Sequence, residues 1–237
     1  MTNKINEAII IAGGSGSRLM PLTKNKPKTL LEINNVPILL RIINWLKRNE
    51  IEHLVIGVAH KKEKIIKYIK DNDNFNLNID ISVHTLKGDT GEAFRLAISR
   101  YSKEENFLAM NSDELTNINL KGISDMHFKY KPIVTMALAP FNCRFSVVNL
   151  KNKYVDNFEY GKKIPYLLVS TGIYIFNKEI LQYIPKTGTI EENTFVKLYK
   201  MKKIVGYKFN KQEDWISVNT FKDIKDAEKI VDKWKFL

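Results

Sequence analysis

The residues best suited to chemistry lie directly after a short apolar run at residues 7–11. Five small residues come first: Ala12, Gly13, Gly14, Ser15 and Gly16. Glycine adopts positive φ angles and lets a ligand approach the backbone, and successive N–H groups of such a turn can surround phosphate oxygens. Arg18 and Lys28 then add positive charge. The pattern predicts a site for a phosphorylated ligand.

Two common phosphate-binding loops do not fit this segment. A Walker loop requires Gly directly before Lys-Ser or Lys-Thr, whereas Lys28-Thr29 follows Pro27. The dinucleotide fingerprint requires a third Gly where Leu19 stands. A glycine-rich turn alone is also compatible with a plain strand-to-loop connection, so the wider spacing must decide between these interpretations.

The first 130 residues alternate between strand-like and helix-like segments. Unbroken apolar runs predict buried parallel strands, and amphipathic stretches predict helices. The expected strands are 7–11, 53–59, 78–84 and 106–115. The expected helices are 37–49, 61–71 and 90–101. Strands joined by helical crossovers indicate a doubly wound α/β sheet, which binds ligands at the carboxyl ends of its strands.

The remainder of the chain follows a different pattern. Strands are expected at 133–139, 145–150, 171–177 and 215–218, and helices at 192–201 and 221–234. The first three strands have little helix between them, which is typical of a mixed or antiparallel extension. No linker rich in Pro, Gly or Ser divides the chain. We therefore expect a Rossmann-like mixed sheet in a single domain over residues 1–237, with a small C-terminal elaboration.

Composition places the chain among ordinary globular proteins. Of 237 residues, 44% are apolar and 27% are charged, which excludes disordered, collagen-like and disulfide-scaffold classes. The net charge of +12 comes mainly from lysine, because only six of the 38 basic residues are arginine. Abundant Asn and Ile beside this lysine indicate a compositional bias, and no clustered aromatic residues accompany it. We therefore expect no nucleic-acid partner.

The sequence also predicts where the protein works. No apolar run is long enough to span a membrane, and the N-terminal residues lack the features of a signal peptide. Cys143 is a lone cysteine and cannot close an internal disulfide. We expect a cytoplasmic protein with no membrane partner, and a homodimer is left open.

The complete spacing over residues 9–33 resembles the signature of the sugar-phosphate nucleotidylyltransferases, or nucleotide-sugar pyrophosphorylases. That signature is Gly-Gly-x-Gly-x-Arg-Leu-x-Pro-Leu-Thr, followed by Pro-Lys and an aliphatic segment. The matching residues are Gly13, Gly14, Gly16, Arg18, Leu19, Pro21, Leu22, Thr23, Pro27 and Lys28. The similarity continues at residues 111–113, 170–174, 191–192 and 215–220. It implies a nucleotide-binding half at 1–130 and a sugar-phosphate-binding half at 131–237.

The resemblance implies attack of a sugar-1-phosphate on the α-phosphorus of a nucleoside triphosphate (NTP), with release of pyrophosphate. Arg18, Lys28 and Asp113 are the implied catalytic residues, and Asp113 would hold Mg²⁺. Many relatives carry Trp-x-Asp-x-Gly-Thr where this chain has Ser217 in place of Asp. Acetylglucosamine-1-phosphate uridylyltransferases are similar in using an Asn two residues further on, so Asn219 is the expected second Mg²⁺ ligand.

The resemblance extends to both substrates. Besides the turn at residues 12–16, the nucleotide would contact Gly88, Asp89 and Thr90; alternatively, Asp89 caps the helix at 90–101. The residues expected to bind the sugar phosphate are Lys162, Thr171, Gly172 and Glu191. The family's Glu-Lys-Pro contact is not cleanly present, and Lys162 is preferred over Lys163 as its replacement.

Several specificities remain open at this level. The Asp113-Glu114-Leu115-Thr116 turn most resembles short mannose- or heptose-1-phosphate guanylyltransferases. One alternative is a cytidylyl- or uridylyltransferase that acts on another phosphorylated acceptor. The other is a catalytically lapsed module that binds nucleotide sugars, which Ser217 and the altered 159–163 segment favour. The four histidines show no metal-ligand spacing and are expected to be structural.

Overall fold

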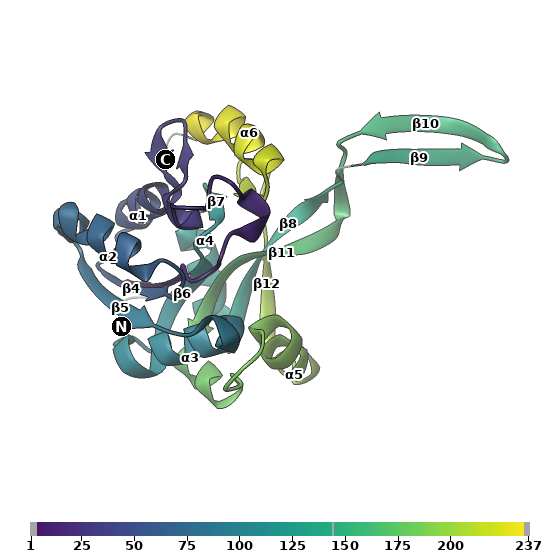
Figure 1. Cartoon of the computed structure of the whole chain (residues 1–237). Helices are drawn as coiled ribbons and strands as arrows, with labels where there is room; N and C mark the ends of the chain where they lie inside the picture. The colour runs from purple at the N-terminus through teal and green to yellow at the C-terminus, as the bar shows by residue number, and fades with distance from the viewer. Residues whose placement is uncertain (1–3, 144, 235–237) are drawn as a thin grey trace.

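The computed structural model, which describes residues 4–143 and 145–234, contains a seven-stranded mixed sheet in the order β12-β8-β11-β6-β1-β4-β5 (Figure 1). Its strands are β1 (Glu7–Ile11), β4 (His53–Val58), β5 (Asn78–Val83), β6 (Asn106–Asn111), β8 (Val134–Asn142), β11 (Lys163–Asn177) and β12 (Ile204–Lys208). β11 runs antiparallel to β6 and β8, and the other neighbouring pairs of the described sheet are parallel. The expected Rossmann-like mixed sheet is confirmed.

Helices cover both faces of this sheet. Their bounds are α1 (Ile38–Arg48), α2 (Lys62–Asp71), α3 (Asp89–Tyr101), α4 (Leu120–Tyr130), α5 (Val196–Lys200) and α6 (Phe221–Ile230). Apolar residues of α1, α2, α4 and α6 share one buried cluster, and those of α3 and α5 share a second. Alternate residues of β1 belong to the two clusters: Ala8 and Ile10 to the first, Ile9 and Ile11 to the second. β1 is therefore buried on both faces, as its unbroken apolar run predicts.

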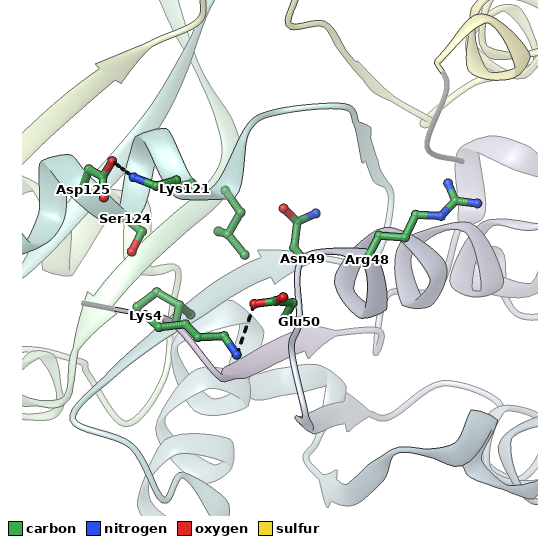
Figure 2. Close-up of a pocket in the computed structure, with 9 residues that line it drawn as sticks. Lys4, Arg48, Asn49, Glu50, Lys121, Ser124 and Asp125 are labelled. Carbon is green, nitrogen blue, oxygen red and sulfur yellow. Dashed lines mark hydrogen bonds and ion pairs between the residues drawn. The ribbon is translucent and has the colours of Figure 1, made fainter. Parts of the chain in front are cut away.

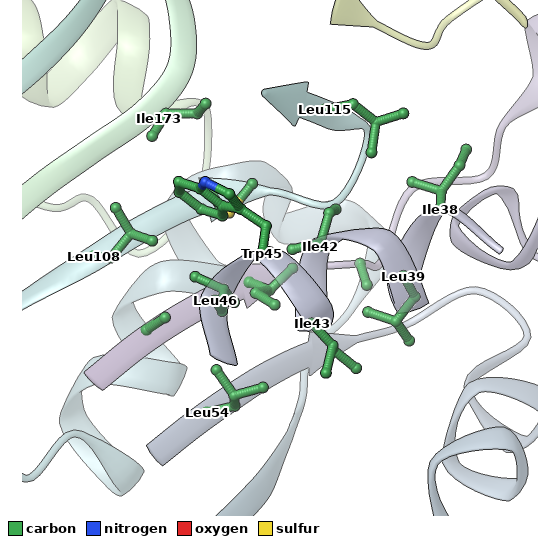
Figure 3. Packing of buried hydrophobic residues seen from close by; sticks show 14 of the residues in the cluster. Ile38, Leu39, Ile42, Ile43, Trp45, Leu46, Leu54, Leu108, Leu115 and Ile173 are labelled. Atoms are coloured by element: carbon green, nitrogen blue, oxygen red, sulfur yellow. The ribbon is translucent and has the colours of Figure 1, made fainter. Parts of the chain in front are cut away.

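Helix α1 shows how the amphipathic pattern becomes packing. The predicted apolar face of Ile38, Leu39, Ile42, Ile43 and Leu46 is completely buried (Figure 3). Trp45 is buried beside these residues and extends the contact with the sheet. The helix begins directly after Pro37, whose fixed φ suits the start of a helix.

The sequence patterns missed α4, and its packing explains why. Its buried positions are Leu120, Ile123, Ser124 and His127, which have the spacing of a helix face but include two polar residues. The apolar period is therefore weak. The helix begins after Asn119, whose side chain accepts a hydrogen bond from the Lys121 N–H.

The structure corrects several other expected elements. The segment 106–115, predicted as a strand running into a polar turn, forms β6 and a turn at Ser112-Asp113. The chain then enters a further short strand, β7 (Glu114–Thr116), which pairs antiparallel with β13 (Trp215–Ser217). The predicted helix 192–201 begins as a π-helical turn over Glu191–Phe195 and continues as α5. The helix expected at 221–234 is α6 followed by a 3₁₀ turn over Val231–Lys233. β2 (Glu32–Ile33), β3 (Val36–Pro37), β10 (Tyr154–Tyr160) and β12 were not expected.

A two-stranded hairpin projects from the body of the molecule beyond the ends of β8 and β11 (Figure 1). It consists of β9 (Ser146–Lys151) and β10, which pair antiparallel and form a sheet of their own. The strand expected at 145–150 corresponds to β9. At the base of the hairpin, the Lys222 ammonium lies 3.4 Å from the Tyr160 hydroxyl.

Candidate active site

The glycine-rich turn opens onto a cavity of about 240 Å³ at the carboxyl ends of β1 and β6. The chain passes from β1 to β4 on one side and later returns to β6 on the other side, so the cavity lies where the strand order reverses. Open α/β sheets bind ligands at such points. Five residues singled out from the sequence line the cavity: Ala12, Gly14, Lys28, Thr90 and Asp113.

The turn itself needs glycine at two positions. Gly16 has a φ of +65°, and a Cβ added there would lie 2.9 Å from the Thr23 Cγ2 atom. At Gly13 an added Cβ would lie 2.2 Å from the His84 Nε2 atom. The Thr23 hydroxyl donates a hydrogen bond of 2.9 Å to the Gly16 carbonyl and closes the loop. The backbone is therefore held tightly and leaves Gly14 and Ser15 exposed.

Arg18 lies in a 3₁₀ turn over Ser17–Leu19 that follows the glycines. Leu19 is buried and anchors this turn, whereas Arg18 is exposed. Among the described residues, no carboxylate forms an ion pair with its guanidinium. Arg18 does not line the cavity.

Three predicted residues from distant parts of the sequence meet beside the cavity. The Lys28 Nζ atom lies 2.5 Å from the Asp113 Oδ2 atom and 2.8 Å from the Asn219 Oδ1 atom. The side chains of Lys28 and Asp113 are only 14% and 19% exposed. Lys28 comes from the 3₁₀ turn after the loop, Asp113 from the turn after β6, and Asn219 from the segment after β13. The structure thus brings the ammonium group of Lys28 into contact with two side-chain oxygen atoms that can also ligate a metal ion.

A chain of hydrogen bonds orients the Asn219 amide. Its Nδ2 atom donates to the Ser217 hydroxyl at 2.6 Å, and that hydroxyl donates to the Glu114 Oε1 atom at 3.0 Å. Trp215 Nε1 donates to the other oxygen of Glu114 at 2.6 Å. Because the amide nitrogen is held by Ser217, the amide oxygen faces Lys28. Sequence reasoning missed Glu114 as a part of this site, since only the pairing of β7 with β13 brings it there.

Glu114 is an unusual carboxyl group. Its side chain is buried, and burial together with the neighbouring Asp113 charge raises its pKa well above the usual value. Gly172, with a φ of +73°, lets the backbone of β11 pass close by: an added Cβ would lie 3.1 Å from the Glu114 Oε1 atom. Gly172 therefore shapes the wall behind Glu114.

The donor set fits a hard divalent cation such as Mg²⁺. A carboxylate oxygen and an amide oxygen converge on one ammonium group, and both are ligands of the type that Mg²⁺ accepts. The described residues contain no group of three or more His, Cys, Asp or Glu side chains arranged around a metal. Mg²⁺ sites commonly use one or two protein ligands and complete their shell with water and phosphate oxygens.

The second predicted nucleotide segment lies at the start of α3. α3 begins at Asp89 itself and has no side-chain capping hydrogen bond, so the interpretation of Asp89 as a helix cap is wrong. Asp89 has a φ of +53° and is exposed. Glu92 instead braces the loop, because its Oε2 atom accepts hydrogen bonds from the Thr85 N–H and hydroxyl. Gly88 is buried against Glu92.

The two halves of the chain also meet at Thr90. Its hydroxyl lies 3.2 Å from the Glu191 Oε2 atom and accepts a hydrogen bond from the Ile190 N–H. The side chains of two other residues expected to bind the sugar phosphate are bonded to other groups of the protein. The buried Thr171 hydroxyl donates to the Ala137 carbonyl at 3.0 Å, and Lys162 pairs with Glu159 at 2.8 Å near the base of the hairpin.

Four other residues complete the lining of the cavity: Ile11, Thr29, Asn111 and Ser112. Asn111 and Ser112 belong to the segment 111–113 that the resemblance includes, but none of the four was assigned a role from the sequence. The Thr29 hydroxyl is buried and has no hydrogen-bond partner among the described residues, so it can bond to a ligand. Its position directly after Lys28 was the one available signal. His84 lies against Gly13, and burial lowers the pKa of its ring.

A larger cavity of about 490 Å³ lies away from all of these residues (Figure 2). It adjoins the segment before β1, the end of α1 and the start of α4. Four of its five charged side chains are paired, Lys4 with Glu50 at 3.3 Å and Lys121 with Asp125 at 2.6 Å. The smaller cavity is the better candidate site, because it lies at the carboxyl ends of β1 and β6 beside the glycine-rich turn.

Comparison with known proteins identifies the family. The family model for nucleotidyl transferases matches residues 7–233. The chain belongs to this nucleotidyl transferase family. It is 28% identical over 231 residues to the mannose-1-phosphate guanyltransferase of Kluyveromyces lactis, covering 92% of this chain and 62% of the relative. It is 32% identical over 234 residues to the bifunctional protein GlmU of Methanocaldococcus jannaschii, covering 96% of this chain and 55% of the relative.

The chain thus spans little more than half the length of several curated relatives. A relative of similar length is the D-glycero-alpha-D-manno-heptose 1-phosphate guanylyltransferase of Aneurinibacillus thermoaerophilus, which is 28% identical over 205 residues, with 85% of this chain and 88% of the relative covered. Among solved structures, HddC from Yersinia pseudotuberculosis complexed with GMP-PN aligns with a TM-score of 0.72 at 19% identity, covering 95% and 99% of the two chains. UDP-glucose pyrophosphorylase complexed with UDP-glucose aligns with a TM-score of 0.74 at 18% identity, covering 97% and 99%. These structures support the fold.

No helix of the described chain is both long and apolar enough to cross a membrane.

Proposed function

We propose that this protein is a Mg²⁺-dependent nucleotidylyltransferase that condenses an NTP with a sugar-1-phosphate into a nucleotide sugar and pyrophosphate. The observation that carries the proposal is the meeting of Lys28, Asp113 and Asn219 beside the glycine-rich turn. The Lys28 ammonium can neutralise phosphate charge, and the side-chain oxygens of Asp113 and Asn219 can ligate a metal ion. Groups of these two kinds beside a glycine-rich loop suit a reaction between two anions. Positioning and charge neutralisation account for most of the catalysis in such phosphoryl transfers.

Each group would have a defined task. The N–H groups of the turn at residues 12–16 would bind the triphosphate, and the exposed Arg18 would bind the pyrophosphate leaving group. Lys28 would contact the α-phosphate and the incoming sugar phosphate. Asp113 and Asn219 would hold Mg²⁺, which when bound supplies further neutralisation of phosphate charge. Contacts of this kind strengthen as charge moves in the transition state, and no covalent intermediate is required.

We propose guanine as the base and a mannose- or heptose-type sugar. The support lies in the relatives, since several are mannose-1-phosphate guanyltransferases and the one of similar length is a heptose 1-phosphate guanylyltransferase. Uridine is the second candidate. It is favoured by Asn219, which stands at the position that the acetylglucosamine-1-phosphate uridylyltransferases use.

The test is pyrophosphate release by the purified chain with Mg²⁺, using each of four NTPs and a panel of sugar-1-phosphates. We expect turnover with GTP and mannose- or heptose-1-phosphate. Arg18→Ala should lower turnover at least about 100-fold without altering the fold, because the side chain is exposed. Arg100→Ala, an exposed arginine at the end of α3, is the matched control and should keep full activity.

Three results would contradict the proposal. Nucleotide binding without turnover in every pairing would favour the lapsed binding module. Full activity of Arg18→Ala would remove that residue from the site. Turnover with UTP alone would replace guanine by uracil.

A further inference from the structure

Two lysine-rich turns meet at one end of the sheet, away from the candidate site. Residues 129–131 (Lys-Tyr-Lys) end α4 and lead into β8, and residues 199–203 (Tyr-Lys-Met-Lys-Lys) end α5 and lead into β12. The segments are neighbours because the Ile133 and Val134 N–H groups both donate to the Lys203 carbonyl, at 3.0 and 3.2 Å. From this point β8 and β12 run parallel. We call the two segments together the basic patch.

The basic patch is far richer in lysine than the chain as a whole. Five of its eight residues are lysine, whereas 38 of all 237 residues are basic. The patch contains no Asp or Glu, and all eight of its residues are exposed. Among the described residues, no carboxylate forms an ion pair with any of the five lysines. The compositional bias of the sequence toward lysine therefore does not account for this local density of positive charge.

The backbone gives a second reason to look beyond composition. Lys131 and Lys202 have φ angles of +48° and +56°, in the left-handed region that favours Gly and Asn. Asn is abundant in this chain and occupies the same region at Asn34, Asn74 and Asn152. The backbone of the two turns alone would favour Asn at both positions. The two lysine side chains are therefore not explained by the turns that carry them.

Large apolar side chains alternate with the lysines of the basic patch. Tyr130, Tyr199 and Met201 are 57%, 60% and 48% exposed. The Lys129 ammonium lies 5.2 Å from the centre of the Tyr130 ring. Tyrosine has an apolar body and a polar tip, and lysine can bury its stem while its ammonium stays in water. This combination is typical of surfaces that contact the boundary between lipid headgroups and acyl chains.

We propose that the basic patch binds the surface of a membrane rich in anionic phospholipids. Several lysines close together are attracted to such a surface, and exposed Tyr and Met side chains add apolar contact. The patch contains no arginine, which is the side chain best suited to forked phosphate contacts, so nucleic acid is the less suitable polyanion. The sequence argues against a membrane-spanning segment, and contact with a membrane surface does not need one.

The position of the basic patch keeps a bound membrane away from the candidate site. The patch lies at the amino ends of β8 and β12, whereas the cavity lies at the carboxyl ends of β1 and β6. β11 runs antiparallel to both β6 and β8, so β6 and β8 point in the same direction. The hairpin leaves from the carboxyl end of β8, and α5 lies on the side of the body away from it (Figure 1). Membrane contact through the patch therefore leaves the cavity open to soluble substrates.

The test is sedimentation of the purified full chain with vesicles of phosphatidylcholine, alone or with about 30% phosphatidylserine. We expect binding only to the vesicles that contain phosphatidylserine, and weaker binding as the salt concentration rises. The double change Lys200→Glu and Lys202→Glu should weaken binding at least about 30-fold, because each substitution replaces attraction by repulsion. Tyr199→Ala should weaken binding about 5-fold at the same salt concentration, because it removes apolar contact with the lipid.

The double change Lys208→Glu and Lys211→Glu is the matched control. Both lysines are exposed and lie at or just beyond the carboxyl end of β12, so the net charge falls by the same amount outside the basic patch. This variant should keep its vesicle affinity within about 3-fold, because salt screens charges that stay more than roughly 10 Å from the lipid surface. All the substituted side chains are exposed, so every variant should keep the native circular dichroism spectrum.

Vesicle binding is the readout, so the result does not depend on the proposed enzymatic activity. Three outcomes would each overturn the proposal. The first is a chain that fails to bind the phosphatidylserine vesicles or binds both kinds of vesicle equally. The second is a control variant that loses as much affinity as the double variant of the patch. The third is tighter binding to duplex DNA than to the anionic vesicles at the same salt concentration.

Discussion

At the scale of single residues, Asn219 decides how the site can hold a cation. Its amide nitrogen is bound by Ser217, and its oxygen lies 2.8 Å from the Lys28 ammonium. Ser217 stands where the resemblance to the family predicts aspartate, and its hydroxyl connects Asn219 to the buried Glu114. We infer that the Asn219 amide, oriented through Ser217 and Glu114, takes the place of that carboxylate in the proposed Mg²⁺ site.

This arrangement predicts graded effects on the Mg²⁺ requirement. Asn219→Ala should raise the Mg²⁺ concentration for half-maximal pyrophosphate release, because it removes an oxygen donor. Ser217→Ala should raise it about 10-fold, since it only frees the amide to rotate. Ser99→Ala, which loses a hydroxyl on the exposed side of α3, is the control and should leave the Mg²⁺ titration unchanged. An unaltered titration for Asn219→Ala would remove that residue from the site.

At the scale of elements, α4 is joined to the sheet by a buried histidine. His127 Nε2 donates a hydrogen bond to the Asn106 Oδ1 atom of β6, and its Nδ1 accepts one from the Thr135 hydroxyl of β8, both at 2.9 Å. Burial lowers its pKa from 6.5 to about 4, so the ring is neutral in the folded protein at neutral pH. The expectation that this histidine is structural agrees with its position.

Stability should therefore fall with acid in a defined window. Between pH 6.5 and about 4 the unfolded chain binds a proton at His127 that the folded chain does not bind. The free energy of unfolding should decrease across this window by up to about 3 kcal/mol. Denaturant titrations at several pH values will measure it, with His127→Asn as the comparison. An equally steep pH dependence in His127→Asn would assign the effect to other groups.

At the scale of the whole molecule, the two proposed halves share one sheet and one core. β11 from the second half lies beside β6 from the first, and Phe176 contacts Phe94 and Phe107 with ring centroids 5.6 and 6.2 Å apart. The candidate site likewise takes Lys28 from one half and Asn219 from the other. We therefore expect the two halves to unfold as one unit.

Phe176→Ala should destabilise the entire chain by about 3–5 kcal/mol, because it leaves a cavity between the halves. We expect a single unfolding transition at lower denaturant concentration, with fluorescence and circular dichroism coinciding. Phe145→Ala is the control, since Phe145 is exposed, and it should leave the transition unchanged. Two separate transitions would show that the halves unfold independently.

The sequence by itself determined the parts of this protein that local chemistry dictates. The apolar run of β1, the glycines at positions 13 and 16, and the amphipathic face of α1 follow from backbone sterics and periodicity, which act over a few residues. The spacing through Lys28 also identified the loop. Where buried positions are polar, as at Ser124 and His127 of α4, the local pattern was too weak to predict the element.

Only the tertiary structure decided which residues from distant parts of the sequence come into contact. Glu114 joins the site because β7 pairs with β13, a contact between segments 100 residues apart. Thr171 turns its hydroxyl to Ala137, and the two segments of the basic patch meet because β8 pairs with β12. Pairing register and long-range hydrogen bonds set these positions. They depend on which strands become neighbours, and no local pattern contains that information.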